Sequence, residues 1–129
     1  MHDDIPCPCG EGARYGSCCG RWHAGPLRLQ APDALALMRS RYSAYVLGQN
    51  GYLLDTWAPE TRPAALPADP PGLRWIGIEV RRHQRIDATH ETVEFVARSK
   101  LGGRATRLHE DSRFERRDGR WVYVDGDLK

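Results

Sequence analysis

The cysteines of this 129-residue chain fall in one short stretch, CPCGEGARYGSCC, and thiols at such spacing can hold a metal ion. They are Cys7, Cys9, Cys18 and Cys19. Tetrahedral zinc takes four soft ligands with sulfur at about 2.3 Å, so the chain would have to double back tightly between the two pairs. Glycines between the pairs permit that reversal. The pattern therefore predicts a zinc site near the N-terminus.

Other roles for these thiols stay open from the residues alone. Cys18 and Cys19 are adjacent and could close a strained vicinal disulfide that acts as a redox switch. His23 lies close enough in sequence to replace one cysteine as a ligand. The first residues, MHDDIP, have no apolar stretch, so we expect no secretory signal and a reducing, cytoplasmic location. A closed four-ligand site leaves no position for water, which favours a structural over a catalytic zinc.

Residues 7–20, CPCGEGARYGSCCG, resemble the SEC-C motif, whose pattern is CPCGSGKKYKxCC or ends in CH. That motif is best known from the carboxyl end of the preprotein translocase ATPase SecA. All four ligand positions match, whereas Glu11 replaces the usual serine, and Ala13 and Arg14 replace the usual basic pair. The resemblance implies that the four cysteines bind zinc and that this knuckle contacts a protein partner.

The elements that follow must position any second site. The stretch 31–48 predicts a helix that begins near Asp33 and ends at Gly48. Its apolar residues form a single stripe, which comprises Leu35, Met38, Tyr42, Tyr45 and Val46. Asn50 is predicted to cap a second, shorter helix. The proline-rich stretch 59–71 predicts an irregular loop that serves as a lid or rim.

From Leu73 onward the hydrophobic pattern alternates residue by residue, which indicates strands. In the first strand Ile76, Ile78 and Val80 share one face, and in the second Val93, Phe95 and Ala97 do so. Gly102-Gly103 and Asp118-Gly119 are typical of tight hairpin turns, which places a third and a fourth strand around them. Helices followed by antiparallel strands predict an α+β fold, a curved sheet with helices on one face.

Five segments, RSRYSAYVLG, YLLDTW, VEFVAR, LHEDSRF and WVYVDGD, resemble the YchJ family of small bacterial proteins with an N-terminal SEC-C motif. The resemblance implies a nuclear transport factor 2-like (cystatin-like) fold, a cone of curved antiparallel sheet closed by helices. It divides the chain into a zinc knuckle at residues 1–25 and an α+β domain at residues 26–129. The family has no established molecular function, so the resemblance implies a fold and a metal but no reaction.

The concave face of such a cone usually encloses a pocket, and the third strand carries polar side chains toward it. Glu110 and Ser112 share a face with apolar residues of that strand, whereas His109 falls on the opposite face. A buried carboxylate is costly unless it is paired, and Arg39 or Arg41 of the long helix could pair with it. The predicted pocket comprises Arg41, Tyr42, Trp75, Glu110, Ser112, Trp121 and Tyr123.

Composition and charge narrow the classes of function. No apolar run approaches the roughly 18 residues that a membrane span requires. The net charge is only +2, and the charges are interspersed, which speaks against a nucleic-acid-binding protein. The basic run 81–85 is typical of a solvated strand edge that discourages pairing with other chains.

Two hypotheses about function remain, and they belong to different classes. The preferred one is a non-enzymatic adaptor that contacts a protein partner through the zinc knuckle. The alternative is a small-molecule-binding protein or enzyme that uses the cone pocket, with Glu110 and an arginine as its polar groups and Glu110 as a general base. A buried pair of glutamate and arginine is more often an ion pair of the core than a catalytic pair, which favours the non-enzymatic role.

Overall fold

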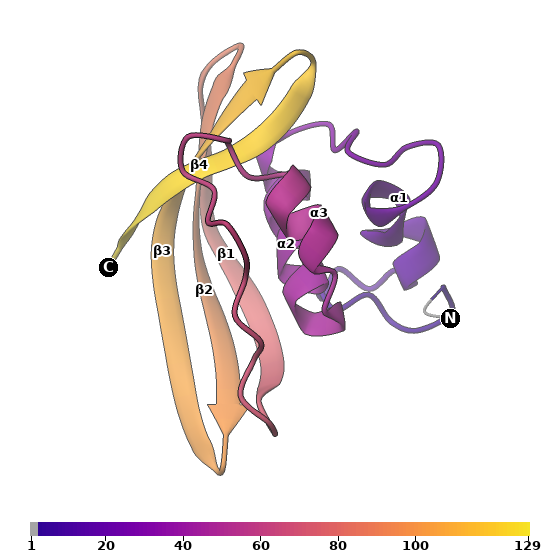
Figure 1. The fold of residues 1–129 in the computed structure, drawn as a ribbon, viewed down its shortest axis with the longest axis vertical. Coiled ribbons are helices and arrows are strands. Elements are labelled where there is room, and N and C mark those ends of the chain that lie inside the picture. The colour runs from indigo at the N-terminus through magenta and orange to yellow at the C-terminus, as the bar shows by residue number, and fades with distance from the viewer. Residues whose placement is uncertain (1–2) are drawn as a thin grey trace.

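The computed structural model describes residues 3–129, which fold into three layers (Figure 1). A curved sheet forms the first layer, and helices α2 (Ala34–Leu47) and α3 (Asn50–Asp55) form the second. The N-terminal segment, residues 3–25, lies on the far side of these helices from the sheet. It contains a 3-10 turn at Tyr15–Ser17 and the short helix α1 (Gly20–His23). None of the helices within residues 3–129 is long and apolar enough to cross a membrane.

The sheet is an antiparallel meander in which the strands keep the order β1-β2-β3-β4. Its strands are β1 (Arg74–Asp87), β2 (His90–Leu101), β3 (Arg104–Arg117) and β4 (Arg120–Leu128). Both predicted hairpin turns are confirmed: φ is 57° and 81° at Gly102 and Gly103, and 51° and 78° at Asp118 and Gly119. Positive φ at both central residues matches the twist of the flanking strands.

Strand β1 departs from simple alternation near its start. Its register with β2 shifts between Trp75 and Gly77, and Gly77 has a φ of 154°, a value that favours glycine. An extra residue at such a bulge re-aims the neighbouring side chains. Ile76 is therefore 51% exposed, while Trp75 and Ile78 both face the concave side. The prediction that Ile76 shares a face with Ile78 and Val80 was wrong, because residue-by-residue alternation of a sequence does not reveal where a bulge interrupts the strand.

Helix α2 has the predicted ends. The side chain of Asp33 accepts a hydrogen bond from Ala36 N at 2.8 Å, and Gly48 ends the helix with a φ of 71°. The helix is buried on more than the predicted stripe, since Ser40 and Ser43 are also fully buried. The sheet covers one side and the N-terminal segment covers the other. The single-stripe prediction was wrong because residues outside that stripe, among them Leu37 and Ala44, are buried as well.

The end of helix α3 connects the helical layer to the sheet. Tyr123 N of β4 donates to Thr56 O, and Ala58 N donates to Tyr123 O, both at 2.8 Å. The helix starts at Asn50 itself, so Gln49 rather than Asn50 occupies the cap position. Stretch 59–71 contains no helix or strand, as predicted. The result is a fixed junction between α3 and β4 beside the concave face.

Candidate functional site

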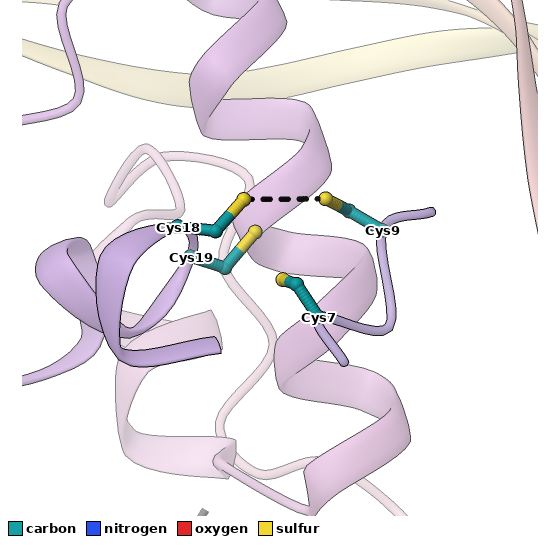
Figure 2. A group of neighbouring side chains, drawn as sticks. All are labelled: Cys7, Cys9, Cys18 and Cys19. Carbon is teal, nitrogen blue, oxygen red and sulfur yellow. Dashed lines mark hydrogen bonds between the residues drawn. The ribbon is translucent and has the colours of Figure 1, made fainter. Parts of the chain in front are cut away.

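The four cysteines converge although they come from two separate stretches of the N-terminal segment (Figure 2). Cys7 and Cys9 lie in the first loop, and Cys18 and Cys19 lie where the chain enters α1. Their sulfur atoms all lie within 4.8 Å of one another, and the Sγ atoms of Cys9 and Cys18 are 3.5 Å apart. Bonds of about 2.3 Å to a tetrahedral zinc would place the sulfurs about 3.8 Å apart. The thiols therefore fit a tetrahedral metal site.

Local backbone contacts bring the two pairs together. Cys7 N donates to Ala13 O at 2.9 Å, and Gly10 N donates to Cys7 O at 3.1 Å. Gly10 and Gly12 have φ of 81° and 89°, left-handed values at which a side chain would be strained. The glycines of the motif thus allow the tight reversal that the sequence predicted.

Three of the four cysteines are buried, Cys18 is half-buried, and the thiols shift one another's pKa values. Hydrogen bonds from Cys19 and Cys9 hold the pKa of the Cys7 thiol far below its ordinary value. The hydrogen bond with Cys7 raises the pKa of the Cys19 thiol. A divalent cation held by the four sulfurs would stabilise the thiolate form of all of them.

Helix α2 forms the back wall of this cluster. Ser43 Oγ lies 3.6 Å from Cys7 Sγ, and Leu47 packs against the group of cysteines. Arg39, also on α2, forms an ion pair with Glu11 at 3.3 Å. The N-terminal segment is thus held to the helix on the side that faces away from the sheet.

His23, which the sequence left open as a ligand, has another role. Its Nδ1 meets the hydroxyl of Tyr15, and its Nε2 donates to the carbonyl of Ser40 on α2 at 2.7 Å. Both ring nitrogens are therefore engaged away from the sulfurs. All four cysteines are free thiols, so the vicinal disulfide between Cys18 and Cys19 is not formed. Within residues 3–129 the structure thus brings the four cysteines together and leaves His23 outside the set.

The concave face of the sheet and helix α2 enclose a cavity of about 310 Å³. Six of the predicted pocket residues line it, namely Arg41, Tyr42, Trp75, Glu110, Ser112 and Tyr123. Trp121 does not: it is 6% exposed and packs in the hydrophobic core. It shares the inner face with Tyr123, as alternation predicted, but lies nearer the β3–β4 turn, where core side chains fill the space. Trp121 is therefore a core residue.

Arg41 is a buried cation in the wall of the cavity. Its guanidinium lies 4.9 Å from the ring centre of Trp57 and 4.8 Å from that of Tyr123. Its Nη1 donates to Leu53 O at 2.8 Å and to Thr56 Oγ1 at 2.7 Å. Burial lowers the pKa of Arg41, but a guanidinium remains charged in proteins. The cavity thus contains a fixed positive charge between two aromatic rings.

Glu110 supplies the opposite charge. Its Oε2 accepts hydrogen bonds from the Ser112 hydroxyl and, at 3.2 Å, from the Tyr123 hydroxyl. A Cβ atom at Gly126 of β4 would lie 2.6 Å from the same oxygen, so the glycine leaves room for the carboxylate. These contacts hold Glu110 in one orientation on the inner face of β3.

The direct ion pair predicted between Glu110 and a helix arginine is not formed among residues 3–129. Arg41 hydrogen-bonds to neutral oxygens near the end of α3, and Arg39 is on the other side of α2. His109 faces away from the cavity, as predicted, and pairs with Glu94 at 2.7 Å. Glu110 and Arg41 therefore line one cavity without neutralising each other by contact.

The predicted pocket omitted four aromatic residues that line the cavity, namely Tyr45, Trp57, Phe95 and Phe114. Phe95 lies on the inner face of β2, so the alternation of that strand could have found it. Trp57 follows α3 and forms an isolated bridge with Tyr123 of β4. A contact between a helix end and the last strand has no local sequence pattern, so Trp57 could not be assigned in advance.

Comparisons with known proteins agree with this architecture. A family model described as YchJ, middle NTF2-like domain, matches residues 33–126. A UPF0225 protein from Bordetella pertussis is 58% identical over 123 residues, which cover 95% of this chain and 92% of that protein. Another, from Methylibium petroleiphilum, is 59% identical over 127 residues, which cover 98% and 91%.

Two solved structures are similar over nearly the whole chain. The solution structure of a SEC-C motif containing protein from Rhodopseudomonas palustris has a TM-score of 0.79 and 32% identity, covering 97% of this chain and 99% of that one. The crystal structure of a SEC-C motif containing protein from Psychrobacter arcticus has a TM-score of 0.78 and 26% identity, covering 100% and 86%. The similarity therefore includes both the N-terminal segment and the cone.

Proposed function

This chain belongs to the YchJ family, and from that membership and its geometry we propose that it is a zinc-stabilised protein that binds a small molecule in its cone. The observation that carries the proposal is the cavity of about 310 Å³ between the sheet and α2. Ligand pockets of about 300–1,000 Å³ combine apolar walls with a few fixed polar groups, and Arg41 and Glu110 are such groups here.

The cysteine cluster is proposed to hold the zinc. Four thiolates suit zinc rather than magnesium or calcium, which prefer oxygen ligands. With every ligand position taken by protein, the metal would stabilise the N-terminal segment against α2 rather than activate water. We propose a boundary near residue 25 between this segment and the cone. A reducing cytoplasm would keep the thiols available for the metal.

A thermal-shift screen of metabolites on the zinc-loaded protein tests the cavity. The Ala97→Leu variant adds volume to a side chain that lines the cavity, and Ala105→Leu adds the same volume at an exposed position of β3. Compounds that stabilise the wild type should stabilise Ala105→Leu equally and Ala97→Leu much less. Equal stabilisation of both variants, or no stabilising compound at all, would contradict small-molecule binding in the cavity.

Metal analysis tests the zinc proposal separately. We expect one zinc per chain in the purified protein and in the Ser17→Ala variant, which changes an exposed neighbour of the ligands. Cys18→Ser removes one of the four sulfurs and should lower the zinc content and the midpoint of thermal unfolding. A metal-free protein with two disulfides would refute the site.

The adaptor role remains a second candidate because the outer surface of the N-terminal segment is hollowed. A shallow groove there is lined by both acidic and basic side chains, among them Asp4, Arg14 and Arg21, and by Leu27, which is 49% exposed. A protein partner bound in this groove should be lost from pull-downs with Leu27→Asp. It should be retained with Leu128→Asp, which changes an exposed leucine at the end of β4. Identical captured proteins with both variants would count against the adaptor.

A further inference from the structure

Hydrogen-bond donors and acceptors are unevenly distributed around the cavity, and Arg41 is the buried cation among the donors. Arg41 donates from Nη1 to two neutral oxygens, and its faces meet the rings of Trp57 and Tyr123. Neutral oxygens satisfy donors without neutralising the charge. A buried cation that lacks a contacting anion favours the entry of a negatively charged group.

Two tryptophans add to this surplus of donors. Nε1 of Trp57 and Nε1 of Trp75 are buried, and neither has an acceptor among residues 3–129. Both side chains line the cavity that contains Arg41. An indole N–H can only donate, and leaving it buried and unpaired costs free energy. Two residues of the cavity wall therefore carry buried N–H donors without an acceptor among residues 3–129.

Glu110 contributes a negatively charged hydrogen-bond acceptor to the cavity wall. Glu110 accepts from the hydroxyl of Tyr123, and Arg41 lies over the ring of the same side chain, so Tyr123 contacts both charged groups. Both hydrogen bonds that Glu110 receives from the described residues reach Oε2. Oε1 is therefore the oxygen that can accept from a donor on a ligand.

The walls of the cavity beyond these polar groups are aromatic and apolar. Trp75 lies with its ring centre 6.0 Å from that of Tyr42 and 6.0 Å from that of Tyr45. Phe95 and Ile78 complete this side of the cavity from the sheet. Aromatic walls of this kind favour a planar, apolar body.

We propose that the cavity binds a small hydroxy acid with a flat apolar body, its carboxylate at Arg41 and its hydroxyl at Oε1 of Glu110. This assignment rests on the proposed function of the cavity and names the class of ligand. A carboxylate matches the planar fork of a guanidinium and can also accept from an indole N–H. The hydroxyl donates to the carboxylate oxygen that the protein leaves open.

Calorimetric titration of the zinc-loaded full chain with three probes tests the assignment: 4-hydroxybenzoate, its neutral amide 4-hydroxybenzamide, and benzoate. Since hydrogen bonds to a charged group are strong, 4-hydroxybenzoate should bind at least about tenfold more tightly than the amide. It should also bind more tightly than benzoate, which has no hydroxyl for Glu110. Equal affinities for 4-hydroxybenzoate and its amide, or no binding of any probe, would overturn the hydroxy-acid assignment.

Variants of the protein test the binding of the carboxylate and of the hydroxyl separately. Arg41→Gln should abolish the preference for the acid over the amide, and Arg113→Gln, on the exposed face of β3, should keep it. Because Arg41→Gln alters a buried residue and can destabilise the fold, Glu110→Gln provides a second test. Glu110→Gln should keep the preference for 4-hydroxybenzoate over its amide and change the preference for 4-hydroxybenzoate over benzoate. If these patterns fail while compounds from the screen still distinguish Ala97→Leu from Ala105→Leu, the cavity proposal stands and only the ligand class is overturned.

Discussion

At His23, a neutral imidazole joins the N-terminal segment to helix α2. The side chain is 3% exposed, donates to Ser40 O, and packs with its ring centre 4.5 Å from that of Tyr52. Desolvation lowers the pKa of His23 because protonation would place a charge in a buried site. The neutral ring thus contributes stability that is present above the ordinary histidine pKa of about 6.5 and is lost as the pH falls.

We therefore expect the wild type to lose more free energy of unfolding between about pH 7 and about pH 5 than His23→Gln does. Urea unfolding of the zinc-loaded proteins at several pH values measures this difference. Loss of metal in acid affects both proteins, so the difference between them reports on the imidazole. Parallel pH profiles for wild type and His23→Gln would contradict the prediction.

The two groups of functional side chains were not equally predictable. The cysteine cluster is local, and the glycines between its two pairs allow the reversal of the chain, so the sequence alone indicated it. Glu110 and Ser112 followed from the alternation of one strand. The environment of Arg41 did not follow, because Thr56 and Trp57 reach it only through the junction of α3 with β4.

At the scale of elements, helix α2 depends on contacts at its N-terminus. Asp33 Oδ1 accepts from Ala36 N at 2.8 Å, and Glu91 Oε1 of β2 accepts from Ala34 N at 3.1 Å. Glu91 is 7% exposed and also pairs with His83 of β1 at 2.7 Å. The first turn of the helix is therefore stabilised both by its own cap, Asp33, and by a hydrogen bond to Glu91 of the sheet.

Asp33→Ala should lower the free energy of unfolding by about 1 kcal/mol, because it removes the acceptor for a helix N–H. Asp69→Ala, in the exposed proline-rich loop, should change it by less than about 0.5 kcal/mol. Urea denaturation of the two variants at neutral pH provides the comparison. If both substitutions had the same effect, the contact with Glu91 alone would suffice to hold the helix start.

The elements themselves were largely predictable, and the errors have identifiable causes. Positive-φ glycines fix the two hairpin turns after β2 and β3, and a cap and a stop signal fix the ends of α2. The bulge that exposes Ile76 and the second buried face of α2 depend on tertiary packing. Ser43 illustrates the second case, because a serine inside a helix gives no sign that a cysteine cluster will cover it.

For the whole molecule, α2 is the layer that the two candidate sites share. The Ser40 carbonyl and the Ser43 side chain contact the N-terminal segment, while Arg41 and Tyr42 line the cavity. Adjacent residues of one helix therefore serve opposite sides of the molecule. Anything that holds the N-terminal segment in place also supports the helix against which the cavity is built.

Removing the proposed zinc should for this reason loosen α2 as well as the N-terminal segment. We expect a chelator to lower the thermal midpoint of the wild type by more than about 4 °C, the shift that roughly 1 kcal/mol produces in a domain of this size. Amide hydrogen exchange should rise in the N-terminal segment and in α2, and change least where β2 pairs with β3. The chelator should have little further effect on Cys18→Ser, whose site already lacks one ligand. Faster exchange confined to residues 3–25 would instead mean that the metal stabilises the segment alone and that the cone, with its cavity, is independent of it.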